Sequence, residues 1–181
     1  MRLFVGLIGT FLVVCALIGT AFFWIGQRAP VQFRTEVATD IEATPDIVWA
    51  ALTNIGTLTD RDDNITEVEL LVVDDHGPLR WKVLRGDTSV MIYKRLVSEP
   101  NRRFEIAIDG GNMAIVGGYE YRLTPLSTSQ TRLIAVEETE IEDILLRAAF
   151  ALAGGRDQVL RAQLAEIKQV SEDYAAETGT L

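Results

Sequence analysis

The chain has 181 residues, 48% of them hydrophobic, and a formal net charge of −9. After an uncharged segment at residues 3–25 it carries 16 basic and 26 acidic residues, a charge of −10 that repels phosphate backbones and excludes nucleic acid as the expected partner. The single cysteine, Cys15, lies within that segment, which excludes a disulfide framework or a thiolate zinc site in the rest of the chain.

Residues 3–25 are predicted to form a transmembrane helix. Such a helix spans roughly 34 Å at 1.5 Å per residue, more than the bilayer hydrocarbon core of about 30 Å. Arg2 precedes the segment, Arg28 follows it, and Trp24 stands where an interfacial aromatic residue is expected. A cleaved signal peptide is the alternative, because residues 19–21, Gly-Thr-Ala, resemble a cleavage site. The apolar region continues past that site, which favours a retained helix that contacts the lipid bilayer.

The predicted helix makes this a single-pass membrane protein with one further domain. We expect an anchor at residues 1–26, a linker at residues 27–30 and a domain at residues 31–181. Positive charges are nearly balanced, since Arg2 lies on one side of the helix and Arg28 and Arg34 lie on the other. The short N-terminal tail favours an inward N-terminus and an extracytoplasmic domain. The sequence leaves the oligomeric state open.

The domain is expected to begin with a strand and a short helix. Residues 31–43 alternate apolar and polar side chains, as in a half-buried strand. Residues 44–46, Thr-Pro-Asp, supply a capping hydroxyl, a proline in the first turn and a carboxylate near the positive end of the helix dipole. A helix is therefore predicted at residues 46–53, and a polar loop or short second helix at residues 54–64.

A run of strands follows, because alternating apolar residues recur between turn residues. Strands are predicted at residues 65–73, 79–84, 88–98, 104–108, 113–123 and 131–139. Every connection is short, so these strands should form an antiparallel meander.

The end of the chain changes to a helical period. A mostly apolar helix is predicted at residues 141–153, and two glycines then interrupt it. A long amphipathic helix is predicted from Arg156 to about Ala176. Its apolar face is expected to hold Leu160, Leu164, Ile167, Val170 and Tyr174.

Two segments resemble the START-like superfamily, also called the polyketide cyclase/dehydrase or SRPBCC family. Residues 41–53 read IEATPDIVWAALT, similar to the family's I-x-A-x-P-x-x-V-W-x-x-L-T opening, and residues 131–138 read TRLIAVEE, similar to a recurrent strand. The resemblance covers residues 31–176 and implies an α+β helix-grip fold, with an antiparallel sheet curved around the long C-terminal helix. Residues 58–61, Leu-Thr-Asp-Arg, replace the Trp/Tyr-Pro-x-Trp cluster of many relatives, so the mouth of the pocket should differ.

The resemblance also implies a binding cleft between the sheet and the long helix. Family members bind lipids, sterols, quinones, hormones or polyketide intermediates there. The residues expected to line the cleft are Trp81, Phe104, Ile106, Tyr119, Tyr121, Leu164 and Ile167. Ordinary core packing is the alternative interpretation of the same side chains.

We expect a membrane-anchored domain that binds or carries a hydrophobic small molecule of the lipid or isoprenoid class. Two alternatives remain open. A cyclase or dehydratase acting on a hydrophobic substrate needs an acid or base with a shifted pKa in the cleft. A non-catalytic interaction scaffold would have a filled core instead of a cavity.

The sequence offers few side chains for catalysis or metal binding. His76, the only histidine, lies in an Asp-Asp-His-Gly-Pro turn, where exposure to solvent is the default. The acidic residues at 60–63 lack the glycine and glutamate that an EF-hand requires. Strand alternation turns either Glu137 or Glu138 inward, but we expect this strand end to be solvated. No catalytic residue, metal site or cofactor is predicted.

Overall fold

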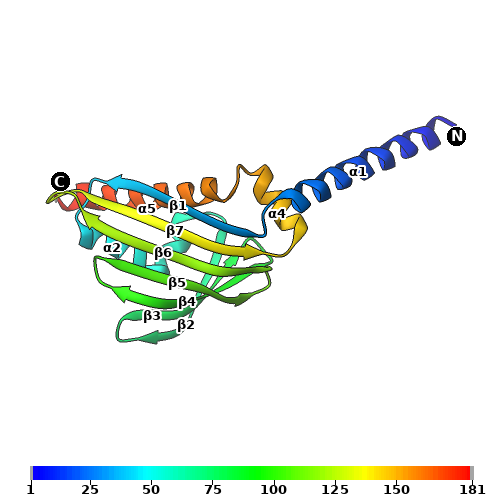
Figure 1. Ribbon diagram of the computed structural model, residues 1–181. Helices are drawn as coiled ribbons and strands as arrows, with labels where there is room; N and C mark the ends of the chain where they lie inside the picture. Colours follow the sequence, from blue (N-terminus) through cyan, green and yellow to red (C-terminus); the bar gives the residue numbers. More distant parts are fainter. Residues whose placement is uncertain (1, 180–181) are drawn as a thin grey trace.

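The computed structural model describes residues 2–179, with side chains described from residue 10 onward. Met1 of the expected anchor and residues 180–181 of the expected domain lie outside this range. One helix, α1 (Arg2–Arg28), projects from a sheet that curves around a second long helix, α5 (Arg156–Thr178) (Figure 1). The antiparallel sheet and the long C-terminal helix confirm the expected α+β helix-grip architecture.

α1 is long and apolar enough to cross a membrane, and the helix projects from the rest of the protein (Figure 1). Within the candidate span Thr10–Arg28 almost nothing is buried. Phe11 is 67% exposed and Leu17 65% exposed, whereas a core helix of a soluble domain would bury such residues. The helix continues through Arg28, so the first two residues of the expected linker at 27–30 are helical.

Seven antiparallel strands form one sheet in the order β1-β7-β6-β5-β4-β3-β2. The strands are β1 (Gln32–Ile41), β2 (Ile65–Asp74), β3 (Gly77–Arg85), β4 (Ser89–Glu99), β5 (Arg103–Gly111), β6 (Ile115–Pro125) and β7 (Thr131–Ile141). The predicted meander is confirmed, because β2 to β7 pair in chain order. β1 pairs with β7, which brings the first strand beside the last.

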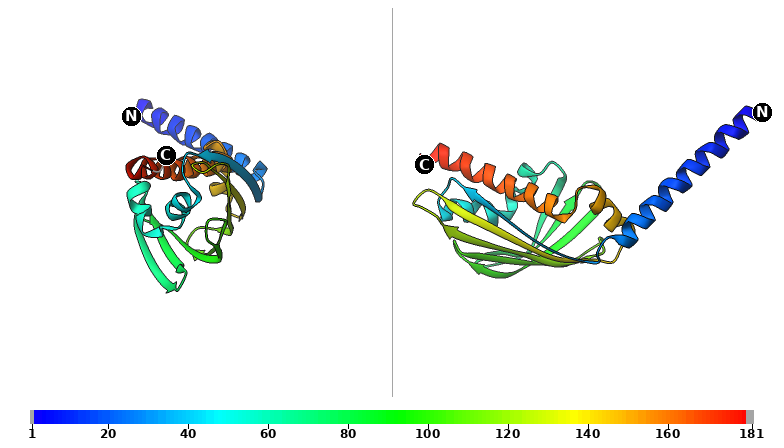
Figure 2. Two further views of the ribbon diagram at one scale, coloured as in Figure 1. Left: turned by 90° about the vertical axis from the view of Figure 1, so that its left-hand side faces the viewer. Right: turned by 45° about the horizontal axis from the view of Figure 1, so that its top comes forward.

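The sheet curves around α5 (Figure 2). Two glycines near the start of β6 allow the neighbouring strands to approach closely. A Cβ atom on Gly117 would collide with the carbonyl oxygen of Glu138, and one on Gly118 would collide with that of Ile106. Gly117 also has a φ of +123°, which residues with a side chain rarely adopt. Larger residues here would push the strands apart.

Three short helical segments, α2 (Pro45–Thr53), η1 (Ile55–Thr57) and α3 (Leu58–Arg61), connect β1 to β2. The predicted start of α2 is confirmed, with Pro45 in its first turn. The prediction that the Thr44 hydroxyl caps this helix is wrong. Thr44 occupies the N-cap position, but its side chain makes no capping hydrogen bond. Its Oγ1 atom is buried and has no hydrogen-bond partner.

The predicted apolar helix near the C-terminus is α4 (Ile144–Leu152). Asp143 caps it by accepting a hydrogen bond of 2.7 Å from the backbone N–H of Leu146. This bond satisfies one of the amide groups that a helix start leaves without an intrahelical partner.

The buried face of α5 agrees with the predicted one in the first half of the helix and differs in the C-terminal half. Leu160, Leu164 and Ile167 are buried as expected, but the face continues through Ser171 and Ala175. Tyr174 was expected on this face and is 55% exposed. α5 packs against β1, and two small side chains at helical spacing let the two backbones approach.

Candidate ligand-binding site

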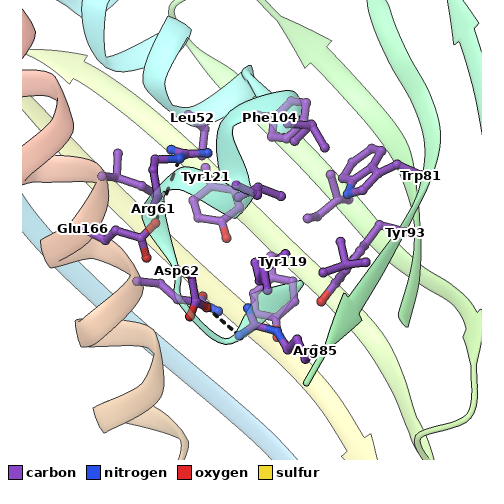
Figure 3. Close-up of a pocket in the computed structure, with 17 residues that line it drawn as sticks. Leu52, Arg61, Asp62, Trp81, Arg85, Tyr93, Phe104, Tyr119, Tyr121 and Glu166 are labelled. Carbon is purple, nitrogen blue, oxygen red and sulfur yellow. Dashed lines mark hydrogen bonds and ion pairs between the residues drawn. The ribbon is translucent and has the colours of Figure 1, made fainter. Parts of the chain in front are cut away.

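A cavity of about 120 Å³ lies between the concave face of the sheet and α5 (Figure 3). Strands β3 to β6 form one wall, and α2, η1, α3 and α5 form the other. The aromatic lining residues are Trp81, Tyr93, Phe104, Tyr119 and Tyr121. The aliphatic ones are Leu52, Ile55, Leu58, Ile65, Val83, Ile106 and Ile167, and the polar ones are Arg61, Asp62, Arg85, Gln163 and Glu166.

Strand register brings the aromatic side chains together. Trp81 of β3 pairs with Tyr93 of β4, and their rings stack with centroids 5.8 Å apart. Phe104 of β5 pairs with Tyr121 of β6. Tyr119 lies two residues before Tyr121, hence on the same face, and their ring centroids are 6.4 Å apart. The result is two groups of aromatic side chains that line one cavity, Trp81 with Tyr93 and Phe104 with Tyr121 and Tyr119.

The structure brings six of the seven predicted cleft residues to this cavity: Trp81, Phe104, Ile106, Tyr119, Tyr121 and Ile167. Leu164 does not line it, because its side chain is 1% exposed and packs into the core. Tyr93 also lines the cavity and was not predicted; it stands opposite Trp81 in the neighbouring strand.

Polar groups of the cavity wall are left available for a ligand. Within residues 10–179, neither the Tyr121 hydroxyl nor the Trp81 indole N–H has a hydrogen-bond partner. Arg156 donates from Nη2 to the Tyr119 hydroxyl oxygen over 3.1 Å. Because a guanidinium is only a donor, the Tyr119 oxygen accepts this bond and keeps its own proton free to donate. Burial raises the pKa of Tyr119 and of Tyr121, so both phenols stay neutral.

Charged side chains surround the mouth of the cavity, between α3, β3 and α5 (Figure 3). Arg85 Nη1 and Asp62 Oδ2 are 2.6 Å apart. Arg61 is turned inward, with a side chain only 7% exposed, and its Nη1 donates to the Ala51 carbonyl oxygen over 2.7 Å. This arginine is the last residue of the Leu-Thr-Asp-Arg segment at residues 58–61, which forms α3.

Glu166 on α5 faces Arg61, with 4.0 Å between its Oε1 and the arginine Nε. Burial raises the pKa of the Glu166 carboxyl, and the neighbouring Arg61 only partly opposes this rise. Across the mouth, burial tends to raise the pKa of Asp62, but hydrogen bonds from Asn64 and Arg85 outweigh it and lower the pKa. The pKa values of these two carboxyl groups are therefore shifted in opposite directions.

A buried ion pair lies beyond Tyr119. Glu137 is 1% exposed and pairs with Arg156, which is 5% exposed. The Arg156 guanidinium also lies over the Phe150 ring, with its Cζ 4.3 Å from the ring centroid. The expectation that this strand end is solvated is therefore wrong for Glu137. The sequence pattern could not show which of Glu137 and Glu138 faces inward. The partner of Glu137, Arg156, lies 19 residues later, at the start of α5.

The arrangement suits an apolar ligand with an oxygen acceptor. The cavity is enclosed mainly by aromatic and aliphatic side chains, and its interior polar groups are chiefly donors. Within residues 2–179, no three His, Cys, Asp or Glu side chains gather closely enough to hold a metal ion. His76 is exposed at the turn between β2 and β3.

Residues 32–172 match the family model described as "Polyketide cyclase / dehydrase and lipid transport". A search of curated protein sequences found no match.

Several solved structures share the fold. They include a START superfamily protein from Mycobacterium smegmatis, with a TM-score of 0.60 and 11% identity, covering 80% of this chain and 98% of that one. The Zhui aromatase/cyclase from Streptomyces sp. R1128 has a TM-score of 0.65 and 16% identity, covering 78% and 94%. Norcoclaurine synthase from Thalictrum flavum, in complex with dopamine and hydroxybenzaldehyde, has a TM-score of 0.60 and 12% identity, covering 81% and 90%. At these identities the similarity is one of fold.

Proposed function

Because the chain belongs to the polyketide cyclase/dehydrase and lipid transport family, we propose that it is a membrane-anchored protein that binds a small hydrophobic molecule between its sheet and α5. The observation that carries this proposal is the aromatic cavity under α5. A scaffold with a filled core would have no such space. α1 would keep the cavity near a bilayer, where hydrophobic molecules accumulate.

The size of the cavity favours a ligand part of about one ring. Its volume of about 120 Å³ is close to that of an engineered apolar cavity of about 150 Å³ that binds benzene. This is smaller than a whole lipid or a long isoprenoid requires. Norcoclaurine synthase, which shares the fold, was determined with dopamine and hydroxybenzaldehyde, both single-ring compounds with oxygen substituents.

The polar groups of the wall favour a ligand that accepts hydrogen bonds. Tyr119, Tyr121 and Trp81 each offer a donor toward the cavity, and burial keeps the two phenols protonated. A carbonyl or hydroxyl oxygen on the ligand would satisfy one or more of these donors. An unpaired donor in such an environment costs about 1–3 kcal/mol, so a ligand without an oxygen should bind more weakly.

The test uses the full chain in phospholipid nanodiscs and two probes, 4-hydroxybenzaldehyde and toluene. Binding is measured by ligand-observed NMR, with empty nanodiscs to subtract partitioning into lipid. We expect both probes to bind and the oxygenated one to bind more tightly. In the variant Val83→Phe the added ring fills the cavity, because Val83 is 2% exposed and lines it, and binding should be lost.

The matched control is Leu96→Phe, which adds a ring at a position that is 53% exposed and outside the cavity. This variant should bind both probes as the original protein does. Absence of binding to the original chain, or equal binding by Val83→Phe, would overturn the proposal.

A cyclase or dehydratase activity is the second candidate, favoured by Glu166. This carboxyl lines the cavity and burial raises its pKa, which are properties of a general acid. Glu166→Gln should then retain binding of 4-hydroxybenzaldehyde, while turnover of any substrate found for the protein is lost. Unchanged turnover in Glu166→Gln would contradict a catalytic role for Glu166.

A further inference from the structure

α4 is fixed against the end of the proposed membrane span. Gly26, near the end of α1, packs so tightly on Ile144 that a Cβ atom there would collide with the Ile144 carbonyl oxygen. Arg147 of α4 donates from Nε to the Gly26 carbonyl oxygen over 3.0 Å and from Nη1 to the Ile141 carbonyl oxygen over 2.9 Å. The two helices therefore meet at the point where α1 leaves its apolar segment (Figure 1).

The outer face of α4 is apolar and uncovered. Leu145 is 61% exposed and Leu152 is 56% exposed, and Ala149 and Ala151 are exposed as well. The helix has one charged residue, Arg147, and its side chain is buried. Such a face is unusual on a chain with 26 acidic residues.

The charge pattern around α4 supports contact with lipid. From residue 144 to residue 155 the sequence contains no acidic side chain. The nearest acidic residues are Glu142 and Asp143 before the helix and Asp157 after it, and the Asp143 carboxylate is engaged in capping α4. Nothing on the outer face would repel anionic headgroups.

We propose that the outer face of α4 lies in the interfacial region of the bilayer that α1 spans, as a second membrane contact. This rests on the proposed anchoring by α1. The contact at Gly26 sets the depth, because residue 26 follows directly on the uncharged segment. Helices with one apolar face lie about 5–10 Å into the headgroup and acyl boundary. Exposed Trp24, at 57%, is a second side chain suited to that depth.

The test measures depth in phospholipid nanodiscs with the full chain. In a Cys15→Ser background, single cysteines replace Leu145, Leu152, Leu126 or Ile18 and carry an environment-sensitive fluorophore. Leu126 is the matched control, an exposed leucine (42%) in the turn after β6, at the end of the domain away from α1. Ile18 lies within the span and reports on α1 itself. Quenching is read with nitroxides on lipid headgroups or deep in the acyl chains.

We expect the probes at positions 145 and 152 to be quenched by the headgroup nitroxide about twofold or more, as interfacial residues are, and the probe at 126 to remain unquenched. The probe at 18 should be quenched by the deep nitroxide. If 145 and 152 behave as 126 does while 18 is deep, the α4 contact is overturned and the anchor stands. If 18 is not quenched either, the anchoring and the α4 contact are both overturned.

Discussion

The Arg156–Glu137 pair is the most buried charge interaction that the structure describes, and it sits at an unfavourable place. Arg156 begins α5, where the helix dipole is positive and a cation is normally disfavoured. Glu137, the Tyr119 hydroxyl and the Phe150 ring all contact this guanidinium and offset that cost. Two of the buried atoms, Glu137 Oε2 and Arg156 Nε, still lack a partner.

Replacing Arg156 with Met should lower the free energy of unfolding by about 3–5 kcal/mol, because Glu137 would remain as an unpaired buried carboxylate. Chemical denaturation of the full chain, followed by circular dichroism, measures this loss. The double variant Arg156→Met with Glu137→Met should recover a large part of it, since neither charge then remains. A double variant no more stable than the single one would contradict this account.

Glu166 predicts a pH dependence of stability. Burial raises its pKa above the ordinary value of 4.5, so folding favours the protonated form. Its contribution to stability is present below that ordinary value and is lost as the pH rises through the folded pKa. Relative to the original protein, Glu166→Gln should therefore become progressively more stable as the pH rises from 4 to 7.

Thermal unfolding at several pH values, with Glu172→Gln on the same helix as a comparison, measures this difference. Glu172 lies outside the cavity and pairs with Lys168, with 3.0 Å between its Oε1 and the lysine Nζ. A stability difference between Glu166→Gln and the original protein that stays constant with pH would contradict the prediction.

At the scale of elements, the sequence predicts most of the fold because strand and helix periods are local signals. The family resemblance predicts Trp81, Phe104, Tyr119 and Tyr121 on the concave face of the sheet, and all four line the cavity there. The C-terminal half of α5 was predicted less well. Its inward Ser171 and Ala175 are not hydrophobic enough to stand out, whereas Tyr174 is.

The contacts between the charged residues of the site could not be predicted from local sequence patterns. Arg61 and Glu166 are 105 positions apart in the sequence, and each looks like an ordinary surface residue of its own segment. Glu137 likewise becomes an inward residue only when α5 brings Arg156 to it. Contacts between polar residues that are far apart in the sequence leave no periodic pattern from which they could be predicted.

The junction of α1 and α4 gives a prediction with a built-in control. Gly26→Leu should disrupt the packing on Ile144, because its Cβ would collide with backbone. Hydrogen exchange of the α4 amides, measured by mass spectrometry in nanodiscs, should rise. Gly19→Leu lies in the same helix, where a Cβ meets nothing within 4 Å, and should leave exchange unchanged. Equal exchange in both variants would contradict a tight junction.

At the scale of the whole molecule, the domain should fold without its anchor. The core under α5 contains no residue of α1. Deleting residues 1–26 removes the Gly26 acceptor of Arg147 but leaves the Ile141 and Glu142 carbonyls that it also contacts. The truncated chain should therefore unfold cooperatively and no longer remain firmly attached to vesicles. A truncated chain without native circular dichroism, or one still inseparable from vesicles, would contradict this.

Arg147 has a consequence for how the domain moves. One guanidinium joins the carbonyl of Gly26 to those of Ile141, at the end of β7, and Glu142. α1 also runs almost directly into β1, with three residues between them. The connection between α1 and the domain is therefore too short and too well fixed for the domain to rotate independently of the helix. With α1 embedded in a bilayer as proposed, the rotation of the domain should be as slow as that of the embedded helix, and the cavity mouth should keep a constant height above the lipid. A ligand would then enter and leave the cavity within a thin layer of solution next to the membrane surface.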